Sequence, residues 1–353
     1  MPAERCVAFA PGRVNLIGEH TDYNQGLALP FAIREGVTVQ AQATTGSPAR
    51  IRALASDLGE SDELPVDHPS RTEGWRAFVR GVVAELTRAG LALPSAQLAI
   101  SGQVPRGAGL SSSAAMEVAL CLALIGLCTE GPGAVWSRLD RTEIARLCAR
   151  VENDWVGAQT GLLDQLACLY GAPDTALLID FRSLSVQPVP FVLGDWRLVV
   201  LDSGERHRHA SSGYNERRRE CERACELLGV RSLREVDLAD LTTLPELLRR
   251  RATHVLRENR RVRAATSALS ADDMPALGRL LDASHESLRD CYEVSTPAVE
   301  KAVKQLLNAG AAGARLIGGG FGGSVLGLFA PGTESPVEAR EVRPGAGAHL
   351  LAS

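Results

Sequence analysis

The feature that most constrains the fold is a glycine-rich turn between an expected strand, residues 96–101, and a long apolar helix, residues 112–128. The turn, residues 104–115, reads VPRGAGLSSSAA. Its glycines let the backbone approach a ligand closely, and unpaired amides at a helix N-terminus favour an anion. An ordinary serine-capped helix is the alternative, but a cap needs one serine and this turn carries three in a row. The unit therefore predicts a phosphate-binding site between a strand and a helix.

Hydrophobic periodicity and turn residues predict further elements throughout the chain. We expect strands at residues 7–10, 28–33, 37–43, 51–54, 176–179, 198–201, 314–317 and 324–329. We expect helices at residues 75–89, 141–153 and 163–170 and over most of 214–309, with polar loops at 57–69 and 331–336. This mixture predicts an α+β fold in two successive halves, residues 1–183 and 184–353.

The overall charge argues against nucleic acid or a membrane as a partner. The net charge is −4 and the pI is about 6.0, so no global field attracts a polyanion. The sequence has no apolar run of about 18 residues, and its first residues lack the pattern of a signal peptide. Eight cysteines without a CxxC pair indicate reduced thiols. We expect a cytoplasmic protein.

Lysine usage restricts the kind of phosphate site. Only Lys301 and Lys304 are present, and both lie in a late amphipathic helix. Walker-type and protein-kinase-type sites require a lysine in a loop or a core strand, so both classes are excluded. A dinucleotide-binding turn is also disfavoured, because Ser112 stands where its third glycine would be. Any triphosphate is held without lysine.

A second polar segment, residues 12–26, reads GRVNLIGEHTDYNQG. Glu19, His20 and Asp22 offer two carboxylates and an imidazole within four positions. Such a set can bind several hydroxyl groups at once, which predicts a polyol or sugar as ligand. A solvated polar turn is the alternative reading of this segment taken alone.

Three further features complete the candidate site. Glu152 ends one expected helix and Asp164 opens the next. Phosphoryl transfer needs a divalent metal held by oxygen atoms and a group that receives the proton of the attacking hydroxyl. Ser113 and Glu152 could hold the metal, and Asp164 could receive the proton. A glycine cluster, residues 318–324 (GGGFGGS), predicts close approach of the backbone to a ligand or to a facing loop.

Together, these motifs and the segment GLLDQ at residues 161–165 resemble the galactokinases of the GHMP kinase superfamily. The resemblance runs roughly from Ala8 to Phe329, and GEHTDY is its most specific part. It implies two α+β lobes: an N-terminal lobe like ribosomal protein S5 domain 2 and a C-terminal lobe with a ferredoxin-like core. It also places the active site in the cleft between them.

The resemblance implies a role for each site residue. Asp164 becomes the base that faces the C1 hydroxyl of the sugar, and Arg13 the cation at the transferring phosphoryl group. Ser113 and Glu152 hold Mg²⁺. The sugar contacts are Glu19, His20, Thr21, Asp22, Gly161 and Tyr214. The ATP phosphates are wrapped by Gly107, Ala108, Gly109, Leu110, Ser111, Ser112 and Ser113.

The resemblance predicts ATP-dependent phosphorylation of D-galactose at C1, by a monomer. A kinase for N-acetylgalactosamine or L-arabinose, and a non-catalytic galactose and ATP sensor, are the alternatives. Leu163 stands where galactokinases usually carry methionine, and Thr160 where cysteine is common. A helix usual before the first strand is absent, and residues 330–337 replace a helix expected after Phe329.

Overall fold

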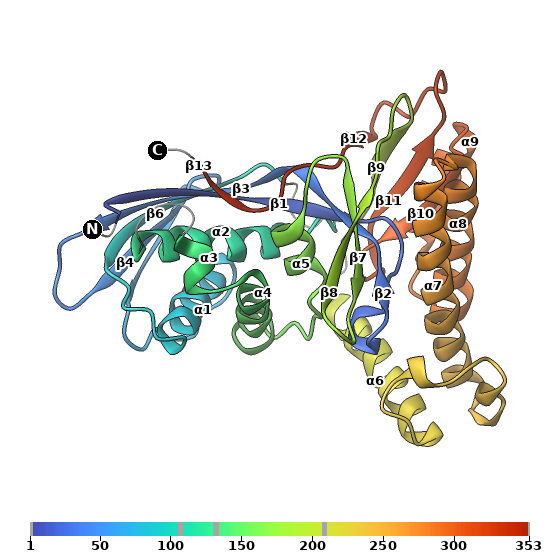
Figure 1. Ribbon diagram of the computed structural model, residues 1–353, viewed down its shortest axis with the longest axis horizontal. Coiled ribbons are helices and arrows are strands. Elements are labelled where there is room, and N and C mark those ends of the chain that lie inside the picture. The colour runs from blue at the N-terminus through green and yellow to red at the C-terminus, as the bar shows by residue number, and fades with distance from the viewer. Residues whose placement is uncertain (1–2, 105–108, 130–133, 207–209, 352–353) are drawn as a thin grey trace.

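A computed structural model describes residues 3–104, 109–129, 134–206 and 210–351. The chain forms an elongated molecule with a sheet-and-helix lobe at either end (Figure 1). The first lobe is built on a six-stranded sheet in the order β13-β1-β3-β6-β4-β5. Its strands are β1 (Arg5–Asn15), β3 (Pro30–Thr44), β4 (Arg50–Ala55), β5 (Glu60–Pro65), β6 (Ser95–Gly102) and β13 (His349–Leu351).

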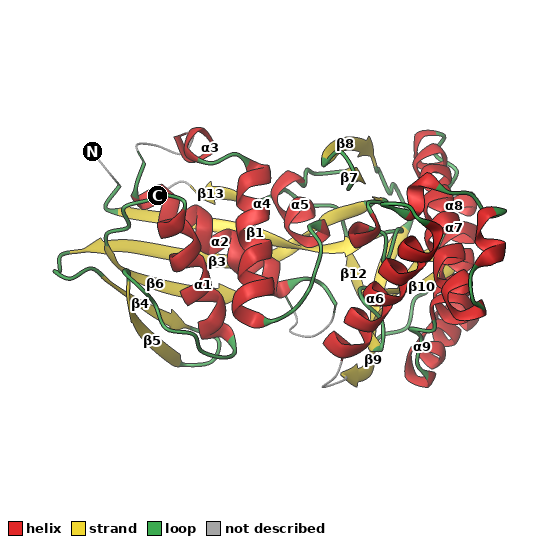
Figure 2. Cartoon of the chain, turned by 90° about the horizontal axis from the view of Figure 1, so that it is seen from below, coloured by secondary structure: helices red, strands yellow, loops and turns green. Residues whose placement is uncertain are grey.

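Helices cover one face of this sheet (Figure 2). They are α1 (Trp75–Arg88), α2 (Ser112–Leu127), α3 (Ala134–Arg138), α4 (Arg141–Arg150) and α5 (Leu163–Tyr170). From Val118 to Leu127 helix α2 carries no polar side chain and is buried, as expected for a helix enclosed by other elements. It packs on β1 and β3 and contacts α1, α4 and α5. The first lobe thus buries its core around α2.

The second lobe is built on a four-stranded sheet in the order β10-β11-β9-β12. Its strands are β9 (Arg197–Arg206), β10 (Gly313–Ile317), β11 (Gly322–Phe329) and β12 (Arg340–Val342). Its helices are α6 (Ala210–Leu228), α7 (Glu246–Ser270), α8 (Met274–Ser287) and α9 (Pro297–Asn308). Helix α8 contacts β10, and α9 contacts β11 and β9. The predicted α+β fold in two lobes is confirmed.

A small third sheet, in the order β2-β7-β8, lies between the lobes (Figure 1). Its strands are β2 (Leu27–Ala28), β7 (Thr175–Asp180) and β8 (Ser185–Pro190). The expected boundary near residue 183 falls in the turn of the β7–β8 hairpin. The division at residue 183 also places the last strand in the wrong half, because β13 pairs with β1 of the first lobe. Pairing between distant segments is not visible in the order of elements along the chain.

Three local predictions differ from the structure. The strands expected at 28–33 and 37–43 are largely one long strand, β3. The loop expected at 57–69 contains β5, whose acidic residues lie at an exposed sheet edge. The helix expected to reach residue 153 ends at Arg150 and continues as a wider π-type turn, Val151–Val156. Single turns of 3-10 helix span Asp22–Asn24, Leu233–Glu235 and Asp240–Thr243, and a second π-type turn spans Leu288–Tyr292.

Candidate active site

A cavity of about 260 Å³ lies where the end of β1, the start of α5, helix α6 and the β10–β11 turn meet. Most of the predicted sugar and catalytic residues line it. The lining residues are Arg13, Glu19, His20, Asp22, Ala158, Gln159, Thr160, Gly161, Leu163, Asp164, Tyr214, Asn215, Gly318, Gly319 and Gly320. Segments separated by up to about three hundred positions in the sequence therefore form one pocket.

The segment after β1 supplies the acidic wall of the cavity. Glu19 is buried, accepts a hydrogen bond from the Gly318 amide at 2.8 Å and lies 3.4 Å from the Arg315 guanidinium. Burial raises the pKa of Glu19, although Arg315 and Arg13 act in the opposite direction. Burial also raises the pKa of Asp22 to about 6, with smaller contributions from the charges of Asp164 and Glu19.

Three other predicted sugar residues form aromatic and backbone parts of the wall. The rings of His20 and Tyr214 lie 5.2 Å apart. Gly161 lies directly against Asp22, and a Cβ at position 161 would overlap the Asp22 carboxylate. Thr21 is placed differently: it is fully buried, and its hydroxyl donates to Gly18 O at 2.9 Å and Leu27 O at 2.7 Å. Its side chain therefore holds the turn, and Thr21 is not among the residues that line the cavity.

Asp164 is the most tightly held carboxylate that faces the cavity. Arg13 donates through Nε to Asp164 Oδ1 at 2.8 Å, and Arg13 Nη2 lies 2.7 Å from the same oxygen. Ser111 donates to the other oxygen, Oδ2. A further contact joins Arg13 Nη1 to Gly109 O at 2.6 Å. The predicted base and the predicted cation are thus in direct contact, and both are tied to the glycine-rich turn.

The described part of that turn has the backbone conformation of a tight glycine-rich turn before a helix. Its predicted members Gly107 and Ala108 lie outside the described residues. Gly109 has φ +70°, and Leu110 O accepts from the Arg13 amide at 3.1 Å. Ser111 precedes α2 in a left-handed conformation (φ +57°) and does not cap the helix with its side chain. The N-terminus of α2 therefore keeps amides available for an anion.

Ser113 and Glu152 meet beside this helix start, as predicted for a metal site. Ser113 Oγ donates to Glu152 Oε1 at 3.1 Å, while Thr160 and Gln165 donate to Oε2. Burial, followed by the charge of Asp164, raises the pKa of Glu152. A hydroxyl and one carboxylate fit Mg²⁺, which keeps water and phosphate oxygens as its other ligands. No cluster of three or more His, Cys, Asp or Glu side chains that could hold a metal alone occurs among the described residues.

A second cavity, of about 290 Å³, lies on another side of the start of α2. Ser112 and Ser113 line it together with the aromatic side chains of Trp75 and Phe78. Its remaining lining residues are Val37, Asp57, Gly74, Ile100, Gly102, Val104 and Met116. This cavity was not predicted from the sequence. The available signal was the pair of aromatic residues, Trp75 and Phe78, at the start of the helix expected at residues 75–89.

The glycine cluster after β10 forms the part of the wall that contacts Glu19 and His20. Besides the Gly318 amide on Glu19, the Gly319 carbonyl lies 3.2 Å from His20 Nε2. A Cβ at Gly320 would come within 2.6 Å of Val294. The predicted close approach of this backbone to a facing loop is confirmed, and the cluster also lines the cavity.

Three family models match the chain. They are described as the galactokinase galactose-binding signature, over residues 2–43, the GHMP kinases N terminal domain, over residues 77–172, and the GHMP kinases C terminal domain, over residues 265–349. The galactokinase of Mycobacterium bovis (strain BCG / Pasteur 1173P2) is 46% identical over 327 residues, covering 90% of this chain and 87% of the relative. The galactokinase of Thermotoga neapolitana is 39% identical, covering 92% and 89%.

Solved structures give the same result. The crystal structure of Lactococcus lactis galactokinase complexed with galactose superposes with a TM-score of 0.88 at 30% identity, covering 99% of this chain and 95% of that one. Methanococcus jannaschii mevalonate kinase shares the fold, with a TM-score of 0.67 at 19% identity and coverage of 96% and 98%. By its sequence and its structure, the chain belongs to the galactokinases of the GHMP kinase superfamily.

Proposed function

We propose that this cavity binds D-galactose and that the chain transfers the γ-phosphoryl group of ATP to the C1 hydroxyl of the sugar. The observation that supports this proposal most strongly is the position of the Arg13–Asp164 pair. The pair lies in the wall of the cavity, and Ser111 and Gly109 connect it to the start of α2. Ser112 and Ser113, the next residues, line the second cavity. A sugar and a nucleotide bound in the two cavities would meet at this pair.

The sugar side offers hydrogen-bond acceptors and donors on several walls. Asp22 and Glu19 can accept hydrogen bonds from hydroxyl groups of the sugar. The His20 ring and the Tyr214 hydroxyl can each donate or accept. The Gly161 backbone lies close to Asp22. Several hydroxyls held at once would fix the sugar in one orientation, with C1 toward Asp164.

In the transfer, the C1 oxygen attacks the γ-phosphorus and the bond to the bridging oxygen of ADP breaks. The C1 hydroxyl proton passes to Asp164, whose oxygens keep a free lone pair beside their contacts with Arg13 and Ser111. The transition state is loose, so it requires mainly positioning and positive charge. Arg13 and the amides at the start of α2 provide charge. Mg²⁺ held by Ser113 and Glu152 would neutralise the phosphate oxygens.

The second cavity fits the nucleotide base. Trp75 and Phe78 provide flat apolar surfaces, and Ser112 and Ser113 lie at its edge near the phosphate site. A base in this cavity and phosphates at the start of α2 would make one continuous nucleotide site. No lysine is needed in this arrangement, in agreement with the composition.

The experiment that tests this proposal is ADP release with MgATP and a panel of sugars. Turnover is expected with galactose, and methyl α-D-galactoside should give none because it lacks a free C1 hydroxyl. Preference for N-acetylgalactosamine or L-arabinose would overturn the choice of sugar. Absence of turnover with every sugar would overturn kinase activity and favour a sensor.

The monomeric state and the cytoplasmic location stay predictions. No described helix combines the length and the apolar character needed to cross a membrane.

A further inference from the structure

Three of the four tyrosines in the chain surround one histidine of the cavity wall. The ring centroids of Tyr23, Tyr214 and Tyr292 lie 5.9, 5.2 and 4.7 Å from that of His20. His20 itself is 3% exposed, and Tyr292 is completely buried. His20 is one of the predicted sugar contacts, whereas neither the sequence motifs nor the proposed reaction gives a role to the side chains of Tyr23 and Tyr292.

The polar atoms of these side chains form a continuous series. His20 Nδ1 lies 2.8 Å from the Tyr23 hydroxyl, which lies 3.0 Å from the Tyr292 hydroxyl. The Tyr292 hydroxyl lies 3.1 Å from the buried Cys221 sulfur. At the other end of the imidazole, Nε2 lies 3.2 Å from Gly319 O, in the cavity wall. The series therefore runs from the interior of the second lobe to the cavity.

The directions of these hydrogen bonds follow from one fixed end. A carbonyl oxygen only accepts, so a hydrogen bond to Gly319 requires the hydrogen of a neutral imidazole to be on Nε2. Nδ1 then accepts from Tyr23, whose single hydrogen is used, so the Tyr23 oxygen accepts from Tyr292. The Tyr292 oxygen in turn is left to accept from the Cys221 thiol.

The titration behaviour of the four groups agrees with this order. Burial, followed by the charge of His254, lowers the pKa of His20 to about 3, so the imidazole is neutral near pH 7. Burial raises the pKa of Tyr23 and Tyr292 well above the ordinary value and that of Cys221 to about 12. Each of these three groups keeps its hydrogen at the same pH.

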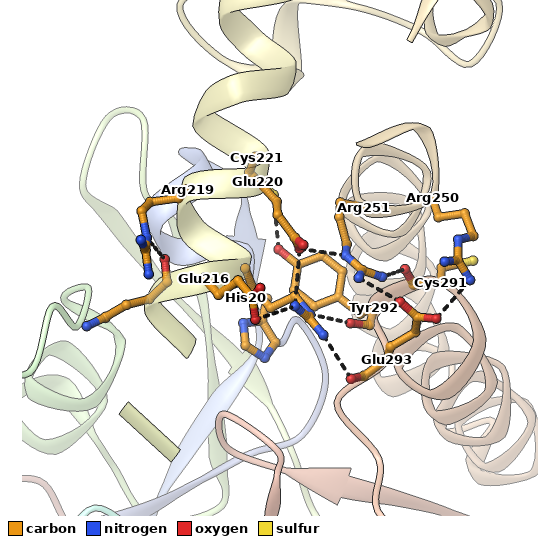
Figure 3. A network of polar contacts seen from close by, with 12 residues as sticks. His20, Glu216, Arg219, Glu220, Cys221, Arg250, Arg251, Cys291, Tyr292 and Glu293 are labelled. Carbon is orange, nitrogen blue, oxygen red and sulfur yellow. Dashed lines mark hydrogen bonds and ion pairs between the residues drawn. The ribbon is translucent and has the colours of Figure 1, made fainter. Parts of the chain in front are cut away.

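Arginine side chains also hold the backbone at Tyr292 (Figure 3). Arg217 Nε donates to Tyr292 O at 2.6 Å, and the buried Arg251 donates through Nη1 to Cys291 O at 2.6 Å. Arg251 further pairs with Glu220 at 2.7 Å. Helices α6 and α7 therefore fix the backbone of the π-type turn that carries Tyr292, and they fix the far end of the series with it.

We infer that Tyr23 and Tyr292 are positioning residues whose hydroxyls, in series and together with the Gly319 carbonyl, hold His20 in the tautomer that carries its hydrogen on Nε2. This tautomer presents the Nε2 hydrogen as a donor on the Gly319 side of the cavity. A sugar oxygen there could accept this hydrogen in place of the Gly319 carbonyl or together with it. The effect on the sugar rests on the proposed function. The tautomer itself does not depend on that function.

The test uses Tyr23→Phe and Tyr292→Phe, which keep the rings, with Tyr170→Phe as the matched control. The Tyr170 hydroxyl contacts Thr142 Oγ1 at 3.0 Å, at the end of α5 remote from Asp164. The first readout is the ¹⁵N shifts of the His20 ring, assigned by loss of the signal in His20→Gln. The wild type and Tyr170→Phe should show hydrogen on Nε2, and Tyr23→Phe and Tyr292→Phe a larger share of the other tautomer, because the series that donates to Nδ1 is broken while the contact with Gly319 remains. Hydrogen on Nδ1 in the wild type would overturn the inference.

The second readout is the KM for galactose, which one lost hydrogen bond should raise roughly tenfold in Tyr23→Phe and less in Tyr292→Phe. The kcat should change less than the KM, because His20 does not touch the reacting atoms. Unchanged ring shifts and an unchanged KM in both variants would overturn the positioning role. Should Tyr292→Phe not fold, Cys221→Ala shortens the series without altering a ring and should show a smaller tautomer shift. If the wild type phosphorylates no sugar, the proposed function fails, while the ring shifts still decide the tautomer.

Discussion

Asp164 is held from two sides, by Arg13 at one oxygen and by Ser111 at the other. Its position was predictable at the residue scale, because the segment GLLDQ and the segment containing Arg13 both match a family motif. The contacts that hold Asp164 in place could not be predicted from the sequence. Nothing in the sequence indicates that Ser111 turns toward Asp164, since this depends on a left-handed backbone at position 111.

Asp164→Asn should reduce kcat by about 10² to 10⁴, because the amide cannot receive the C1 proton. Its size and its contact with Arg13 stay similar, so the Kd for galactose, measured by calorimetry, should change only a few-fold. Asp62→Asn is the matched control: Asp62 pairs with Arg80 at 2.8 Å in the first lobe, away from the cavity. Unchanged turnover in Asp164→Asn would remove this residue from the catalytic role.

The raised pKa of Asp22 leads us to expect that the free energy of unfolding depends on pH. Its pKa is raised to about 6, so the folded state favours the protonated form. The stabilising contribution of this group is therefore complete below about pH 4 and is lost as pH rises through about 6. Asp22→Asn cannot ionise, so its free energy of unfolding relative to the wild type should rise by about 2 kcal/mol between pH 4 and pH 8.

Urea unfolding at several pH values measures this difference. Asp62→Asn provides a control of opposite sign, because its hydrogen bond from Arg80 lowers the pKa of Asp62. That variant should lose stability relative to the wild type as pH rises. A difference between Asp22→Asn and the wild type that is constant over pH would contradict the raised pKa.

At the scale of elements, the prediction succeeded where apolar periodicity is long and failed at polar edges. The bounds predicted for α5 agree with the structure, and α2 differs by one residue at its C-terminal end. Strand β5 was assigned to a loop, because its acidic residues lie on an exposed edge strand whose pairing with β4 depends on the rest of the sheet. The glycine cluster after β10 was recognised, but its facing segments were not.

The close approach of Gly320, in the β10–β11 turn, to Val294 can be tested by substitution. Gly320 and Gly332 have similar φ values, +75° and +77°, but a Cβ at 320 would lie 2.6 Å from Val294, whereas one at 332 meets no atom within 4 Å. Gly332→Ala should lose about 1 kcal/mol, the cost of a left-handed alanine. Gly320→Ala should lose more and should also raise the KM for galactose, because Gly318 and Gly319 contact the cavity residues. Equal losses of stability and an unchanged KM would show that the close approach is unimportant.

At the scale of the whole molecule, the two lobes are joined by pairings that sequence order conceals. Arg315 of β10 is fully buried and donates to Leu16 O at 2.9 Å and to Asn15 O at 3.1 Å, at the end of β1. It also lies beside Glu19. A buried arginine on an apolar strand gave no sequence signal of its role, since its partners lie 299 and 300 positions away.

Arg315→Met should lower the free energy of unfolding by roughly 3 kcal/mol or more, because it leaves Glu19 buried beside fewer compensating groups. Urea unfolding measures the loss. Arg340→Met is the control: Arg340 of β12 pairs with Glu35 of β3 at 2.9 Å, but its side chain is 43% exposed. That variant should lose less than about 1 kcal/mol. Similar losses in the two variants would contradict a special contribution of the buried arginine.

The central claim is that the sugar cavity and the start of α2 together direct phosphoryl transfer to the anomeric hydroxyl. The most direct test is ³¹P and ¹H NMR of the product formed from MgATP and D-galactose. We expect one phosphorylated sugar whose anomeric proton is coupled to phosphorus, together with an equal amount of ADP. A phosphate at any other carbon, or ADP formed without a phosphorylated sugar, would contradict it.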